Sequence, residues 1–173
     1  MPVIRTPDDR FDNLPDFPFP PNYVDVDGMQ MHYIDEGQGE VILCLHGEPS
    51  WSYLYRKMIP ILSAKHRVVA PDFTGFGRSD KYTATEEHSY QMHCDTMMCL
   101  LDAVGLTDST LVCQDWGGLI GLRLAAEHTD RFARLVIMNT GLPTGDQKMS
   151  DAFMTWREFA RNNPDLPVGF IMQ

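Results

Sequence analysis

Short apolar runs alternate along the chain with segments in which apolar residues recur at helical spacing. Because these runs are unbroken, they predict strands that are buried on both faces, as in a parallel sheet. The predicted strands cover residues 41–45, 67–71, 110–114 and 133–138.

The intervening segments predict helices over residues 52–64, 88–104 and 117–128. Pro60 interrupts the first of these, and Gly105 suits the C-terminal stop of the second. The methionines and cysteines of the second helix favour core packing over a cofactor site. The apolar face expected for the first helix consists of Leu54, Met58, Ile61 and Leu62.

The beginning of the chain departs from this alternation. Residues 1–22 are rich in proline, which predicts an extended arm rather than a helix or a central strand. Residues 23–34 alternate in polarity around Asp27-Gly28, a pattern typical of a β-hairpin. The side chains expected to hold the arm on the body are Phe11, Phe17 and Phe19.

Strands and helices that alternate after an antiparallel hairpin predict an α/β fold with a mostly parallel sheet. The core of this fold is expected over residues 1–140. Residues 141–173 change in character and include an amphipathic stretch at 151–161, so we expect them to form a separate region.

In such a sheet the carboxyl ends of the parallel strands form one rim, where ligands bind. Asp115 and the loops 46–50 and 72–80 all follow predicted strands, so the sequence brings them to that rim. His46 is expected to support the first loop. Asp72 and Asp80 are expected to hold the second loop through local Asx-type hydrogen bonds.

Composition and charge restrict the class of partner. The 173 residues are 43% hydrophobic and 22% charged, as in globular domains, and a formal net charge of −10 argues against nucleic acid or an anionic membrane surface. No apolar run has the length of a membrane span, and the N-terminus lacks a signal-peptide pattern. The four cysteines show no metal-ligand spacing, so we expect no metal or cofactor and a reducing, cytoplasmic location.

Asp115 stands on the turn between the strand 110–114 and the helix 117–128. Its flanking residues, Cys113 and Gly117, are small, as in the G-x-S-x-G nucleophile elbow, with aspartate in place of serine. A carboxylate is ionised at neutral pH and needs no base to activate it. Asp115 is therefore a candidate nucleophile. The alternatives are a helix cap or a cation ligand at a strand end.

Several motifs together resemble those of the haloalkane dehalogenases, which have the α/β-hydrolase fold. The resemblance extends over about residues 3 to 173 and implies a hydrolase core that is followed by the start of a helical cap. The motifs are His46-Gly-Glu-Pro-Ser-Trp-Ser-Tyr-Leu-Tyr-Arg56, Pro71-Asp-Phe-Thr-Gly-Phe-Gly-Arg-Ser-Asp-Lys81, Cys113-Gln-Asp-Trp-Gly-Gly118 and Phe153-Met-Thr-Trp156.

This resemblance implies that Asp115 displaces halide from a small haloalkane and forms an ester that water then hydrolyses. Trp116 and Trp156 would bind the halide, because an indole N–H can only donate. The backbone N–H groups of Glu48 and Trp116 would form the oxyanion hole. The implied partners are a haloalkane, water and halide, and the full-length protein is expected to be a monomer.

The resemblance also implies a truncated chain, because members of this family are much longer than 173 residues. One branch of the family carries its catalytic acid after the strand that corresponds to 133–138, where this chain has Asn139. The acid and the catalytic histidine are therefore expected beyond Gln173. The histidines present, none of which lies at the family's base position, are His32, His46, His66, His88, His93 and His128.

Two other functions stay open. An epoxide hydrolase of the same fold also uses an elbow aspartate followed by tryptophan, although Glu48 and Trp156 favour the halide reaction. The chain could alternatively be a non-catalytic ligand-binding module or a truncated fragment, which the absence of a catalytic histidine favours.

Overall fold

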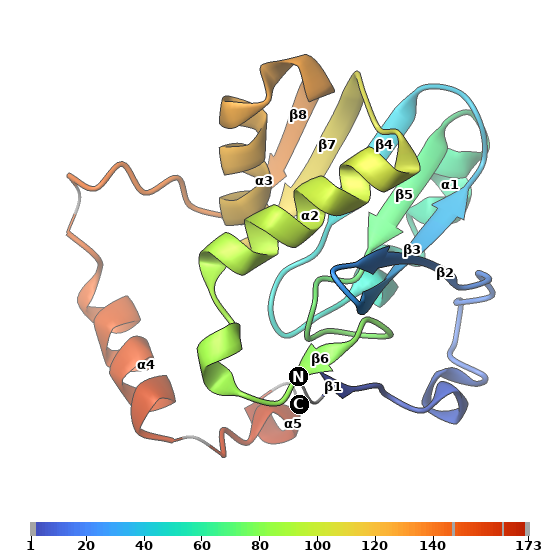
Figure 1. The fold of residues 1–173 in the computed structure, drawn as a ribbon. Coiled ribbons are helices and arrows are strands. Elements are labelled where there is room, and N and C mark those ends of the chain that lie inside the picture. The colour runs from blue at the N-terminus through green and yellow to red at the C-terminus, as the bar shows by residue number, and fades with distance from the viewer. Residues whose placement is uncertain (1–2, 147, 164, 172–173) are drawn as a thin grey trace. The chain divides into compact units, whose positions relative to one another are not determined.

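The computed structural model describes residues 3–146, 148–163 and 165–171, and it divides the chain into two compact units, Met1–Gly141 and Leu142–Gln173. Figure 1 shows the elements of both units. The second unit contains the amphipathic helix α4 (Asp151–Asn162) and the short helix α5 (Val168–Ile171).

The first unit is built on a mostly parallel sheet, as the sequence predicts. Within the described residues its strands are β2 (Asn22–Val26), β3 (Met29–Glu36), β4 (Val41–Leu45), β5 (Arg67–Pro71), β7 (Ser109–Gln114) and β8 (Phe132–Met138). Their spatial order is β2-β3-β5-β4-β7-β8. The pairs β2–β3 and β3–β5 are antiparallel, whereas β5, β4, β7 and β8 run parallel to one another.

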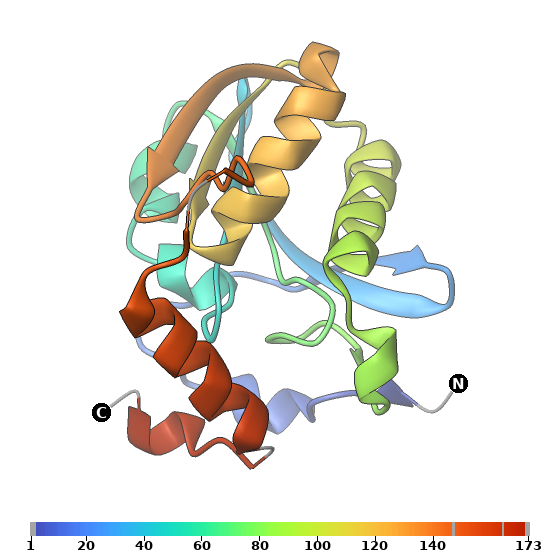
Figure 2. The same ribbon diagram turned by 90° about the vertical axis from the view of Figure 1, so that its left-hand side faces the viewer.

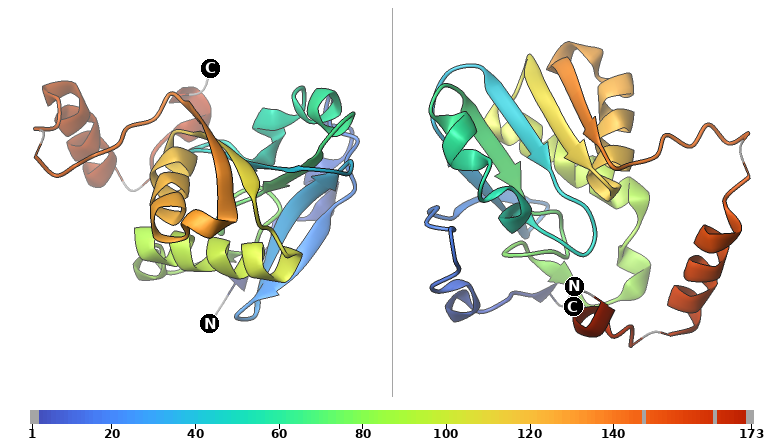
Figure 3. Two further views of the ribbon diagram at one scale, coloured as in Figure 1. Left: turned by 90° about the horizontal axis from the view of Figure 1, so that it is seen from above. Right: turned by 180° about the vertical axis from the view of Figure 1, so that it is seen from behind.

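Helices cover both faces of this sheet. The helices α2 (Tyr90–Val104) and α3 (Trp116–Glu127) pack on one face, and the 3₁₀ helix η2 (Ser52–Tyr55) and α1 (Ile59–Ser63) lie on the other (Figures 2 and 3). The remaining elements are the strands β1 (Val3–Ile4) and β6 (Lys81–Tyr82) and the 3₁₀ helices η1 (Asp8–Phe11), η3 (Thr85–Glu87) and η4 (Thr129–Arg131).

The side chains of the central strands alternate between two apolar clusters, which explains why their sequences are apolar without a break. In β4, Leu43 and Leu45 face α2 and α3, while Ile42 and Cys44 pack with Tyr55 of η2. A strand that is covered on both faces gains burial from every residue rather than from every second one. At the sheet edge, β8 keeps Leu135, Val136 and Ile137 about half exposed.

The prediction of one helix over 52–64 is wrong, because the segment divides into η2 and α1. Pro60 has no N–H to donate to an earlier carbonyl and occupies the first turn of α1. The break also changes which side chains are buried. Tyr55 and Ile59 enter the core instead of Leu54, Met58 and Ile61, which are exposed, and Leu62 is partly buried.

The helix predicted over 88–104 begins two residues later, at Tyr90. Ser89 is its N-cap, and the Ser89 hydroxyl accepts a hydrogen bond from the Met92 N–H at 3.1 Å. Gly105 ends the helix in the left-handed conformation with φ 68°, as the sequence predicts.

The predicted hairpin and arm are both present. Asp27 and Gly28, with φ 51° and 83°, form the turn between β2 and β3. The aromatic rings of Phe11 and Phe17 lie 5.3 Å and 5.1 Å from that of Trp51, which fixes the arm on the body. The strand β1 of the arm pairs with β6, just after the loop 72–80.

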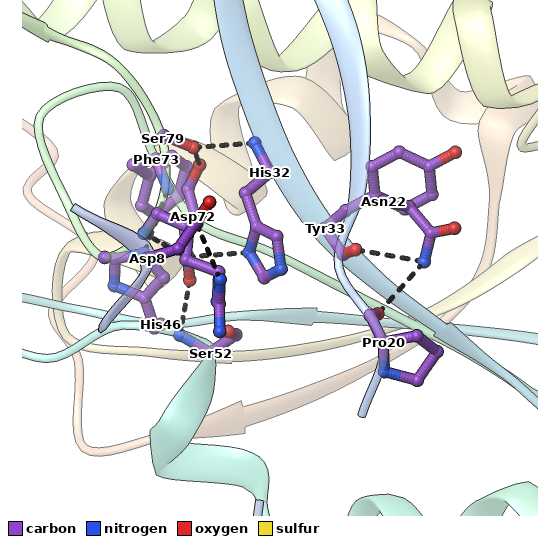
Figure 4. Close-up of polar contacts among 12 residues, drawn as sticks. Asp8, Pro20, Asn22, His32, Tyr33, His46, Ser52, Asp72, Phe73 and Ser79 are labelled. Atoms are coloured by element: carbon purple, nitrogen blue, oxygen red, sulfur yellow. Dashed lines mark hydrogen bonds and ion pairs between the residues drawn. The ribbon is translucent and has the colours of Figure 1, made fainter. Parts of the chain in front are cut away.

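Long-range contacts and one hydrogen bond across the loop hold the loop 72–80, in place of the local Asx turns that the sequence suggests. Asp72 is fully buried and accepts hydrogen bonds from His32 Nδ1 at 2.8 Å and from the backbone N–H groups of Ser52 at 2.8 Å and Arg78 at 2.9 Å (Figure 4). Burial raises the pKa of Asp72, but the hydrogen bonds from His32 and Ser52 outweigh it, so the pKa lies below its usual value.

We expect Asp72→Asn to destabilise the first unit by about 3 kcal/mol at neutral pH, because it breaks a buried charged network. A depressed pKa stabilises the folded state above the unfolded-state pKa, and this contribution is lost as the pH falls through the folded-state value. The difference from wild type should therefore shrink from about pH 4 downwards. Urea unfolding at several pH values measures the difference in unfolding free energy between wild type and variant.

The control is Asp130→Asn, which removes an exposed carboxylate from η4. Its unfolding free energy should stay within about 0.5 kcal/mol of wild type at every pH. A pH-independent loss in the Asp72 variant would contradict the role assigned to the ionised carboxylate.

Candidate functional site

Asp115 stands on a strained turn between β7 and α3. Its backbone has φ 52° and ψ −125°, a combination that costs a non-glycine residue about 1–3 kcal/mol. Asp115 occupies the N-cap position of α3, yet its side chain makes no capping hydrogen bond. The geometry is therefore that of a nucleophile elbow and not that of a helix-capping aspartate.

Residues that follow β8 hold the backbone of this turn. The Asp115 N–H donates to the Asn139 carbonyl at 3.2 Å, and the Asp115 carbonyl accepts from the Thr140 hydroxyl at 2.7 Å. Sequence reasoning missed Thr140. The only available signal was its position directly after an apolar strand, at the rim where Asp115 lies.

The elbow and the loop 46–50 approach so closely that two positions require glycine. A Cβ atom on Gly117 would lie 2.3 Å from the Leu45 carbonyl oxygen, and one on Gly47 would lie 2.3 Å from Asp115 Oδ1. Because a real Cβ does not come this close to another heavy atom, any larger residue would push the two segments apart. The glycines bring Glu48 within reach of Asp115.

The carboxylate of Asp115 accepts a hydrogen bond from the backbone N–H of Glu48, with 2.9 Å between Glu48 N and Asp115 Oδ1. The Glu48 side chain lies beside this contact. Burial and the nearby charge of Asp115 raise the pKa of Glu48 above its usual value. The site thus combines one carboxylate with a backbone donor aimed at it.

His46 fixes the loop that carries this donor, as the sequence suggests. The Phe73 N–H donates to His46 Nε2 at 3.0 Å (Figure 4), which leaves the proton on Nδ1. The Nδ1 atom in turn donates to the Gly47 carbonyl at 3.0 Å. Burial lowers the pKa of His46, which favours this neutral form. Both ring nitrogens are occupied, so His46 has a supporting role in the described structure.

A pocket of about 200 Å³ opens beside the elbow within the first unit. Its walls are mainly aromatic and aliphatic. Some belong to the loop 72–80, which the sequence places at this rim, and others belong to the start of α2, which sequence reasoning did not assign to the site. The lining residues are Gly47, Glu48, Phe73, Phe76, His88, Ser89, Tyr90, His93, Trp116 and Ile120.

The structure brings three of the four predicted site residues together. Glu48 and Trp116 line the pocket, and Glu48 is hydrogen bonded to Asp115. The Trp116 side chain is 43% exposed, with its ring 6.5 Å from that of Tyr90. Trp156 belongs to α4 of the second unit, where it is 46% exposed and its ring lies 5.8 Å from that of Phe159.

Comparison with protein families agrees with this geometry. Residues 40–169 match the model of the alpha/beta hydrolase fold, which covers most of the chain and both the elbow and the loop 46–50. The chain belongs to the alpha/beta hydrolase fold family. A fold does not by itself decide a reaction, since this family supports many chemistries.

Comparison with individual proteins shows which members of the fold family the chain is similar to. The chain is 53% identical to a haloalkane dehalogenase from Psychrobacter cryohalolentis over 98% of its own length and 58% of that protein's. It resembles the tetrameric haloalkane dehalogenase from Paraglaciecola agarilytica with a TM-score of 0.92 and 43% identity, covering 99% of this chain and 60% of that one. This hydrolase-fold chain thus spans less than two thirds of the length of these relatives.

An epoxide hydrolase variant from Vigna radiata is more distant, with a TM-score of 0.70 and 30% identity over 80% of this chain and 44% of that one. Within the described residues, no three histidine, cysteine or acidic side chains are grouped so that they could hold a metal ion. No helix in the described part of the chain is long and apolar enough to cross a membrane.

We expect Gly47→Ala to destabilise the first unit by about 1–3 kcal/mol and to displace the Glu48 amide, because the new methyl group would overlap the Asp115 side chain. Urea unfolding measures the first effect, and the ¹H and ¹⁵N shifts of the Glu48 amide report the second. Gly141→Ala is the matched control, since a Cβ atom there meets nothing within 4 Å. Equal effects of the two substitutions would contradict the close approach.

Proposed function

We propose that the whole protein hydrolyses small haloalkanes to an alcohol and halide, and that this chain carries the nucleophilic half of the site. The observation that carries the proposal is the Asp115 carboxylate, held on a strained elbow with the Glu48 N–H 2.9 Å away and an apolar pocket beside it. The 53% identity to a haloalkane dehalogenase supports this choice of reaction.

In the first step, a carboxylate oxygen of Asp115 attacks the carbon that bears the halogen. The new C–O bond forms as the C–halogen bond breaks, and the electron pair of that bond leaves with the halide. The product is an alkyl ester of Asp115. The aliphatic and aromatic walls of the pocket suit an alkyl chain, and they exclude water that would compete for the substrate.

The departing halide needs donors that are neither nucleophiles nor acids. Trp116 lies next to the nucleophile in sequence and lines the pocket, so its indole N–H is one such donor. Trp156 is the second halide ligand of the proposal, and it comes from the region 141–173, which we assign to the start of a helical cap. This assignment rests on the resemblance to dehalogenases and on the exposed aromatic face of α4.

Hydrolysis of the ester belongs to the whole protein. Water attacks the ester carbonyl and gives a tetrahedral intermediate whose oxyanion needs donors. We assign the backbone N–H groups of Glu48 and Trp116 to this oxyanion hole. Support comes from Glu48, which already donates to a carboxylate oxygen of Asp115. A histidine base and a second carboxylate complete the proposed reaction.

Epoxide opening is the second candidate, and the similarity to the Vigna radiata enzyme favours it. The two reactions leave different adducts. A bromoalkane loses bromide and adds only its alkyl group to Asp115, whereas an epoxide adds all its atoms, oxygen included. The choice between them is therefore visible in the mass of the modified chain.

The proposal places the protein in a reducing compartment, the cytoplasm. Cys44, Cys94, Cys99 and Cys113 are free thiols in the structure, which supports this choice. Its partners are a haloalkane, water and halide. A monomeric full-length protein stays a prediction, and one structural relative is a tetramer.

Incubation of the 173-residue chain with 1-bromobutane should add one butyl group to it, detected by intact mass and located on Asp115 by peptide mapping. Asp115→Ala should take up none. The exposed-site control Asp130→Asn should react like wild type. An adduct from 1,2-epoxybutane but none from 1-bromobutane would assign epoxide opening instead, and no adduct from either would leave the binding-module alternative.

Replacement of Trp116 by phenylalanine should slow this alkylation by about tenfold or more, because phenylalanine keeps the ring but removes the N–H donor to the halide. The rate of butyl incorporation measures the effect. Tyr90→Phe is a suitable control, since it alters a ring that neighbours Trp116 without removing an indole donor. Equal rates in the Trp116 variant and wild type would contradict the halide role.

A further inference from the structure

His93 differs from the other polar residues around the pocket, because its ring has a buried hydrogen-bonding atom without a partner among the described residues. His93 lies in the first turn of α2 and forms part of the pocket wall. Its Nδ1 atom is buried and has no hydrogen-bond partner among the described residues. Buried polar groups in proteins are nearly always paired, so an unpaired one beside a pocket is a candidate partner for a polar group on a ligand.

Aromatic rings surround the histidine. The ring of Phe73 lies 5.7 Å from it in an edge-on arrangement, and that of Phe76 lies 6.4 Å away. Burial lowers the pKa of His93 to about 4. The imidazole is therefore neutral near pH 7, with one N–H donor and one unprotonated nitrogen that can accept a hydrogen bond.

His88 provides an internal comparison within the same pocket. It lines the pocket too, but its Nε2 lies 3.2 Å from the Tyr82 carbonyl oxygen, so one of its ring nitrogens is already used. His46, which packs near the same aromatic rings, has both nitrogens occupied. Of these three histidines, only His93 has a buried ring nitrogen without a partner among the described residues.

We propose that His93 is a specificity-determining residue that pairs with a neutral polar group, a hydroxyl, on the alkyl chain of the substrate. The inference rests on the proposed function and names the substrate class that the site prefers: haloalcohols over haloalkanes of equal size. A hydroxyl both donates and accepts, so it can satisfy either nitrogen of a neutral imidazole.

Charged substituents fit this pocket less well. A carboxylate on the substrate would meet the carboxylate of Asp115 and the side chain of Glu48, and a neutral His93 would offer it no compensating positive charge. The carboxylate would also lose its hydration on entering the pocket, and the aromatic walls would offer no hydrogen bonds in return. The chemistry of the pocket therefore selects a neutral polar group in an otherwise apolar chain.

The test compares two bromides of nearly equal size, 3-bromo-1-propanol and 1-bromobutane, which differ by a hydroxyl in place of a methyl group. The ratio of their second-order rates of adduct formation on Asp115 is measured by intact mass. Replacement of His93 by phenylalanine should lower this ratio by about tenfold, the effect of one lost hydrogen bond. His93→Asn, which places an amide where Nδ1 stands, should restore part of it.

The matched control is His88→Phe, the same substitution in the same pocket, which should leave the ratio within about twofold of wild type. Urea unfolding verifies that each variant is folded. An unchanged ratio in His93→Phe, or an equal fall in His88→Phe, would overturn the inference while leaving the proposed function intact.

A second measurement remains informative if neither bromide reacts, a result that would count against the proposed function alone. The ¹⁵N shifts of the His93 imidazole are followed during titration with 3-chloro-1-propanol and with 1-chlorobutane. A shift of the ring nitrogens with the alcohol that is larger than with the alkane supports hydroxyl recognition. Equal shifts, or none with the alcohol, would overturn it.

Discussion

The contact between the Glu48 amide and the Asp115 carboxylate depends on how closely two backbones can approach at the rim of the sheet. Only glycine at positions 47 and 117 allows this distance, because a methyl group at either would occupy space held by the opposing segment. The strained φ of Asp115 has the same origin, since a relaxed turn would carry the carboxylate away from the loop. The rim is therefore arranged around one short donor–acceptor distance.

That distance is supported from further inside the molecule. His46 connects the loop 46–50 to Phe73, and the neighbouring Asp72 connects the loop 72–80 to His32 on β3 (Figure 4). Each connection is a buried hydrogen bond, which restricts the movement of the two loops. The fold itself therefore holds the Glu48 donor beside the Asp115 carboxylate.

The sequence predicts the parts of the fold that depend on local pattern. The strands of the sheet, the hairpin at Asp27-Gly28 and the elbow at Asp115 follow from apolar runs, turn residues and small flanking residues. The break at Pro60 and the partners of Asp72 could not be predicted in the same way, because they depend on contacts between residues far apart in the chain. The same reason explains why Thr140 and His93 were missed: the residues around each of them come from segments far away in the chain.

The N-terminal arm has a consequence for the order in which the molecule is assembled. Arg5 forms a bidentate pair with Asp80, and Asp8 pairs with Arg78, so these contacts join residues 75 and 70 positions apart. These long-range contacts stabilise the fold only after the intervening strands are in register, because until then the entropy of the open chain opposes them. During synthesis Arg5 and Asp8 therefore emerge long before their partners in the loop 72–80, and they are among the last residues to be fixed.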